Sequence, residues 1–68
     1  MHRQDINTVA RQELAIAQSH GGSAREAVAS LMARCKQNPD LYRQLMDHYG
    51  HSTLREACVN AIKHTKQQ

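Results

Sequence analysis

The chain has 68 residues and a formal charge of +3, and five histidines add positive charge below about pH 6.5. This mild excess falls well short of the basic tails typical of nucleic-acid binding, and no apolar run approaches the about 18 residues that a membrane-spanning helix needs. The two cysteines provide no disulfide framework, and residues 1–5 do not resemble the start of a signal peptide. The sequence therefore predicts a single cytoplasmic domain, residues 1–68, without membrane contact.

The expected core is small and poor in large side chains. A domain of about 60 residues buries only about 60% of the surface of its unfolded chain. This chain has no Phe or Trp, and nine of its apolar residues are alanine. We therefore expect self-association or a protein partner to supply further apolar area. No alternating run of β-branched residues occurs in the sequence, and no turn dipeptide lies between two such runs, so no strand is predicted.

The first predicted helix covers residues 6–19, with Asp5 or Asn7 as its N-cap. Apolar residues at helical spacing predict its inward face, which comprises Ile6, Val9, Ala10, Leu14, Ile16 and Ala17. Glu13 falls inside the same arc. We expect its long side chain to carry the carboxylate out to water at the edge of this face. The alternative is a buried carboxylate that has a partner or a functional role.

The second predicted helix covers residues 24–37 and follows a glycine turn at residues 20–22. Ser23 to Glu26 has the pattern of a capping box, in which a hydroxyl and a glutamate three residues later satisfy free backbone N–H groups. The predicted inward face comprises Ala24, Ala27, Val28, Leu31, Met32 and Cys35. This helix ends before Pro39, because the residue that precedes a proline is pushed out of the helical region.

The third predicted helix covers residues 39–49. Asn38 is a suitable N-cap, and proline at the first helical position loses no hydrogen bond. The apolar residues form an arc of about 140°, wider than the stripe of an ordinary surface helix, and they are Leu41, Tyr42, Leu45, Met46 and Tyr49. Leu45 lies near the middle of this arc and should be central to the core. We expect Gly50 to end the helix in the left-handed conformation.

The fourth predicted helix lies near residues 53–64, and Thr53 to Glu56 again has the pattern of a capping box. Its inward face comprises Leu54, Ala57, Cys58, Ala61, Ile62 and Thr65, and residues 65–68 form a polar, fraying end. The fold class predicted from these four elements is all-α. We expect a compact domain of four short helices, arranged as two helical hairpins packed together.

Two segments of the chain resemble each other at an offset of thirty residues. Residues 23–28 and 53–58 share an Arg-Glu-Ala sequence and the apolar spacing behind it. A duplicated helical hairpin would explain this similarity. The simpler explanation is that capping chemistry selects the same residue types at every good helix start, and we favour it.

Candidate sites for chemistry are few. His48, His51, Cys58 and His64 form the one group with metal-binding side chains, but their predicted positions do not converge as zinc requires, so no metal is expected. The sequence has no glycine-rich phosphate loop, nucleophile elbow or pair of acidic residues in an apolar setting. We therefore expect a non-enzyme that has no cofactor.

A nucleic-acid interface is suggested by the last helix. Residues 49–57 resemble the turn and the start of the recognition helix in winged-helix repressors of the GntR type, which would imply DNA binding. The segment lacks about two residues between Ser52 and Thr53, and no wing strands follow it. Arg55, Val59, Lys63 and Lys66 lie at i, i+4, i+8 and i+11, a stripe that could follow phosphates. The alternative is a solvated helix face, with cations near the helix C-terminus.

The leading functional hypothesis is a small non-catalytic interaction module that presents helix faces to itself or to another protein. Self-association as a twofold dimer is expected through Tyr42, Met46 and Tyr49, because tyrosine and methionine are enriched at interfaces. In a monomer the same side chains would instead cover the first helix. The second hypothesis is a small DNA-binding transcription regulator that uses the stripe from Arg55 to Lys66.

Overall fold

A computed structural model describes residues 4–50 and 53–66 and confirms the all-α fold. Its helices are α1 (Ile6–Ser19), α2 (Ala24–Gln37), α3 (Pro39–Tyr49) and α4 (Leu54–Lys66). The first three have the predicted bounds, whereas α4 continues two residues past its predicted end. Thr65 explains the difference, because its side chain is buried and its hydroxyl donates a hydrogen bond to the carbonyl of Ile62 at 2.8 Å.

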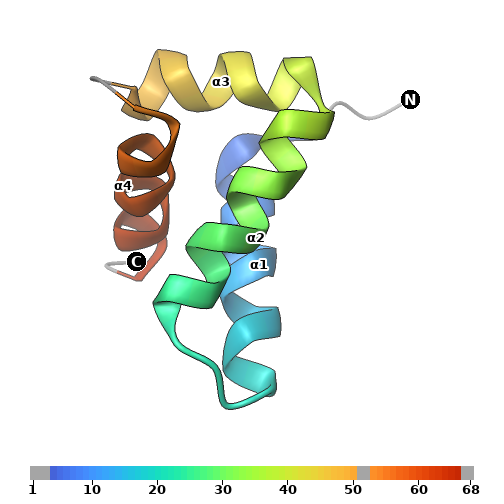
Figure 1. Cartoon of the computed structure of the whole chain (residues 1–68), viewed down its shortest axis with the longest axis vertical. Coiled ribbons are helices and arrows are strands. Elements are labelled where there is room, and N and C mark those ends of the chain that lie inside the picture. The colour runs from blue at the N-terminus through green and yellow to red at the C-terminus, as the bar shows by residue number, and fades with distance from the viewer. Residues whose placement is uncertain (1–3, 51–52, 67–68) are drawn as a thin grey trace.

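Helices α1 and α2 form the first hairpin, and α4 packs beside both of them. Helix α3 runs across one end of this group, where it covers α4 and the end of α2 (Figure 1). One residue, Asn38, separates α2 from α3, so the chain turns sharply there. The Cα radius of gyration is 10.9 Å, which matches the about 11 Å of a compact domain of this length.

Three of the four helices have the side-chain caps expected from their sequences. The Asp5 carboxylate accepts a hydrogen bond from the N–H of Thr8 at 3.2 Å. The Asn38 side chain accepts from the N–H groups of Asp40 and Leu41, and the Thr53 hydroxyl accepts from the N–H of Glu56 at 3.1 Å. The capping box predicted at Ser23 is wrong, because only the backbone carbonyl of that residue, and not its hydroxyl, accepts N–H groups of α2.

Two glycines end helices in different ways. Gly21 has a φ of +74° and closes α1 in a Schellman motif, with hydrogen bonds from Gly21 to the carbonyl of Gln18 and from Gly22 to that of Ala17. The left-handed conformation predicted for Gly50 is wrong, since its φ is −77°. Glycine is needed there for a different reason, because a Cβ atom would lie 2.6 Å from the carbonyl oxygen of Met46.

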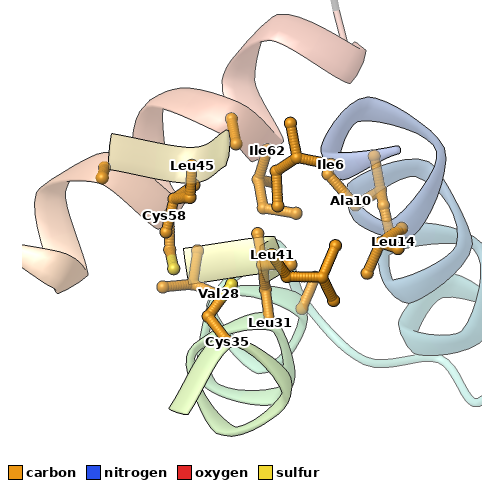
Figure 2. Close-up of a cluster of buried hydrophobic side chains, with 14 of the residues drawn as sticks. Ile6, Ala10, Leu14, Val28, Leu31, Cys35, Leu41, Leu45, Cys58 and Ile62 are labelled. Atoms are coloured by element: carbon orange, nitrogen blue, oxygen red, sulfur yellow. The ribbon is translucent and has the colours of Figure 1, made fainter. Parts of the chain in front are cut away.

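The core lies where the four helices meet (Figure 2). Its largest fully buried side chains are Ile6, Val9, Leu31, Cys35, Leu41, Leu45, Cys58 and Ile62. Leu45 is fully buried, as predicted. Ile16, predicted to face inward, is 51% exposed, because the neighbouring helices do not cover that side of α1 near its C-terminal end.

Candidate functional site

A groove of about 250 Å³ lies between α2 and α4, and we call it the α2–α4 groove. Helix α2 contributes residues from its first turns, and α4 contributes residues along its whole length. The described residues that line it are Ala24, Arg25, Val28, Arg55, Val59, Ile62, Lys63 and Lys66. All four members of the predicted stripe, Arg55 to Lys66, are among them.

The floor of the α2–α4 groove is apolar and continuous with the protein core. Val28 and Ile62 are core residues that are 9% and 1% exposed. Ala24 and Val59 are half-buried and pack against the same core. The floor is therefore held in place by the packing of α2 against α4, and its shape does not depend on a flexible loop.

The rim of the groove is positively charged. Arg25, Arg55, Lys63 and Lys66 are all exposed, and within the described ranges none of these four side chains forms an ion pair. No carboxylate is among the described lining residues. Four like charges around one groove raise the local positive potential, so the rim attracts anionic groups.

Arg25 and the α2 side of the floor were not predicted as part of a site. They belong to the groove only because α2 packs against α4, and the periodicity of a single helix cannot reveal that packing. A usable signal was present in the similar segments 23–28 and 53–58, in which Arg25 and Arg55 occupy equivalent positions. Both arginines line the α2–α4 groove.

The residues predicted for self-association have different surroundings along α3. Tyr42 is 43% exposed, while Met46 and Tyr49 are half-buried against the core. The Tyr49 hydroxyl donates a hydrogen bond to the side-chain oxygen of Asn7, and its ring centroid lies 5.9 Å from that of His64. Burial and the nearby Asp5 carboxylate raise the pKa of the Tyr49 phenol, which favours its role as a donor. Tyr49 therefore links α3 to both α1 and α4 within the chain.

Glu13 does not extend into water, contrary to our prediction. Its side chain is only 10% exposed, and its Oε1 accepts a hydrogen bond from Nη1 of Arg34 at 3.0 Å. The pair joins α1 to α2 on a side of the molecule that does not include the α2–α4 groove. Because a buried carboxylate needs a charged or hydrogen-bonded partner, Arg34 explains the burial of Glu13 as a structural feature.

Cys35 and Cys58 are free thiols that are 1% and 0% exposed. A hydrogen bond between them lowers the pKa of Cys35 and raises the pKa of Cys58, and burial raises the pKa of Cys58 further. Figure 2 shows both side chains within the core, where they extend from α2 and α4. Thiol chemistry with a ligand requires access from solvent, which neither sulfur has in the folded chain.

No group of three or more potential metal ligands occurs in the described part of the chain. His48 and His64 are exposed, Cys58 is buried, and His51 lies outside the described residues. The winged-helix resemblance includes residues 51 and 52, which also lie outside them, and residues 4–50 and 53–66 contain no strand that could form a wing. Across the described helices, none combines the length and the apolar character needed to cross a membrane.

Comparisons of the chain with protein-family models, with curated protein sequences and with solved structures found no match. The α2–α4 groove, with its apolar floor and its cationic rim, is therefore the feature of the molecule that indicates a function.

Proposed function

We propose that the protein is a small non-catalytic interaction module, and that the α2–α4 groove binds a segment of a partner protein. One observation carries this proposal. The groove combines an apolar floor with four exposed cations that have no ion-pair partner among the described residues. Interfaces between proteins commonly have this arrangement, with an apolar centre and a polar rim.

The chemistry of the lining favours binding over catalysis. The described lining residues are apolar side chains, arginines and lysines, and they include no carboxylate, imidazole, hydroxyl or thiol group. Within this set only the lysine amines could act as a nucleophile or a base, and the lining offers no carboxylate or imidazole that could assist them. The volume of about 250 Å³ also lies below the about 300 Å³ at which small-molecule sites begin, and it suits a few side chains of a larger partner.

Binding of a labelled helical peptide tests this proposal. The probe carries leucines at i, i+3, i+4 and i+7 and uncharged polar residues elsewhere, and fluorescence anisotropy follows its titration. We expect saturable binding that Val59→Lys abolishes, because this change puts a charge on the floor. Asn60→Lys is the matched control, since it adds the same charge on α4 beside the groove and should preserve binding. If no apolar peptide binds, or if both variants lose binding equally, the proposal is wrong.

DNA binding is a second candidate function that one further observation favours. Helix α3 ends at Tyr49, α4 begins at Leu54, and α3 lies across the end of α4 in Figure 1, an arrangement that resembles the two helices of a helix-turn-helix unit. In such a unit α4 would be the recognition helix, and it would present the exposed side chains of Arg55 and Lys63 to the phosphates. Binding to a short duplex should then weaken steeply with salt and weaken further in Arg55→Ala and Lys63→Ala.

Val59→Lys separates the two candidates. The substitution adds a cation between Arg55 and Lys63, which strengthens contact with phosphates. If the variant binds duplex DNA more tightly but no longer binds the apolar peptide, DNA binding and peptide binding are two separable properties of this one surface. If the duplex does not bind to the wild-type protein at low salt, DNA binding is eliminated.

A further inference from the structure

We infer that the α2–α4 groove accepts an amphipathic helix whose apolar stripe is flanked by acidic residues. This inference rests on the proposed function, which requires only that a protein segment binds in the groove. It adds the secondary structure and the charge of that segment, and it excludes partners with a basic or neutral flank as the preferred ligands.

The dimensions of the groove match a helix that lies along α4. Arg55 and Lys66 are eleven positions apart on one helix, which corresponds to about 16 Å, or about three turns. Between these ends, Val59 and Ile62 of α4 and Val28 of α2 form a narrow apolar floor. A partner helix presents apolar side chains at i, i+3, i+4 and i+7, so two successive turns would place their side chains on this floor.

The positive charges on the rim determine which residues are favoured on the two flanks of the partner helix. Cations lie on both sides of the floor, with Arg25 on α2 and Arg55, Lys63 and Lys66 on α4. Acidic residues on both flanks of a partner stripe would each meet a cation, whereas basic flanks would bring like charges together in a partly desolvated site. Such a rim mainly controls the rate of association and the choice of partner, and its effect decreases with salt.

The floor favours a helix over a nucleic acid as the occupant. A phosphate backbone satisfies the four cations but has no apolar group that would cover the half-buried side chains of Ala24 and Val59. An amphipathic helix satisfies both features at once. A second copy of this chain is the other macromolecular occupant to test, and its binding would appear as an increase in molecular mass with concentration.

Three labelled peptides with identical leucine positions and with Glu, Gln or Lys flanks test the inference. We expect the Glu-flanked peptide to bind at least about tenfold more tightly than the Gln-flanked peptide at low salt, because several rim pairs act together. This advantage should shrink as salt rises. Lys63→Glu should reduce the preference, and the double variant Arg25→Glu with Lys63→Glu should reverse it in favour of the Lys-flanked peptide.

Arg43→Glu is the matched control, because Arg43 is an exposed cation on α3 away from the groove, and this variant should keep the preference for Glu flanks. Circular dichroism verifies that each variant is folded, and Lys63→Gln replaces Lys63→Glu if the latter unfolds. Equal binding of all three peptides that Val59→Lys still abolishes would overturn the inference and leave the proposed function intact. If none of the peptides binds, the proposed function fails as well.

Discussion

Leu45→Ala should destabilise the fold severely, and Ile16→Ala should have little effect. Leu45 is fully buried at the centre of the core, where deletion of the side chain leaves a cavity and costs about 2 to 5 kcal/mol. At about 0.05 to 0.15 kcal/mol per residue, the whole chain is stable by only about 3 to 10 kcal/mol. Ile16 is 51% exposed, so the apolar contact it loses is small, and alanine has the higher helix propensity.

Thermal and urea unfolding, followed by circular dichroism, measure both variants. For a domain of this size each kcal/mol changes the melting temperature by about 4 to 8 °C, so Leu45→Ala should lower it by at least about 8 °C. We expect the melting temperature of Ile16→Ala to stay within about 4 °C of the wild type. A drop of only one or two degrees for Leu45→Ala, or equal drops for the two variants, would show that the core has been misplaced.

Three further predictions concern the remaining side chains. Glu13→Gln should destabilise the chain by about 1 to 3 kcal/mol in urea unfolding, because the hydrogen bond from Arg34 loses its charged acceptor, and an unchanged midpoint would show that the pair contributes nothing. Cys35 and Cys58 should react with a thiol-specific disulfide reagent at least about 100-fold more slowly in the folded chain than in the urea-unfolded chain, because reaction requires opening of the core. Rapid labelling of either thiol in the folded chain would contradict its burial. Self-association through α3 remains a prediction: Tyr42→Ala should shift sedimentation at micromolar concentration toward the monomer, and Tyr42→Phe should not. A wild-type protein that is monomeric at every concentration would refute it.

Local patterns in the sequence predicted most of the fold, because each helix carries its own start and stop signals. Asp5, Asn38 and Thr53 identify three helix starts through side-chain caps, and the structure contains all three. Gly50 does follow the end of α3 as predicted, but the physical reason predicted for a glycine there was wrong. Glycine at a helix end indicated a left-handed residue, whereas close contact with the carbonyl of Met46 is the actual reason for it.

Two other errors came from contacts between helices. The N-terminal turn of α1 is covered by α3, where the N–H of Ile6 donates to the side chain of Gln44 at 3.0 Å. Ile16 lies near the other end of α1, about 15 Å further along the helix, where α3 does not reach. Periodicity assigns both isoleucines to the same broad inward face, but they lie about 80° apart around the helix axis, and Ile16 falls at the edge of that face. The periodicity of α1 also could not predict the burial of Glu13, because its partner Arg34 lies on another helix, α2.

Only one side of the candidate site could be predicted from the sequence. Its α4 side was predictable, since Arg55, Val59, Lys63 and Lys66 share one stripe on one helix. Its α2 side depends on how α2 and α4 pack, which the sequence patterns did not specify. The stripe alone resembled a surface for phosphates, and the apolar floor between the two helices is the feature that favours a protein partner.

The most direct test of the central claim is a nuclear magnetic resonance titration of the isotope-labelled protein with the Glu-flanked helical peptide. Backbone amide shifts report contacts residue by residue in a chain of this size. Binding in the α2–α4 groove predicts saturable shift changes concentrated in Ala24 to Val28 and Arg55 to Lys66, with α3 and the middle of α1 unaffected. Changes concentrated around Tyr42 on α3, or no saturable change at any position, would contradict the assignment of this groove as the binding surface.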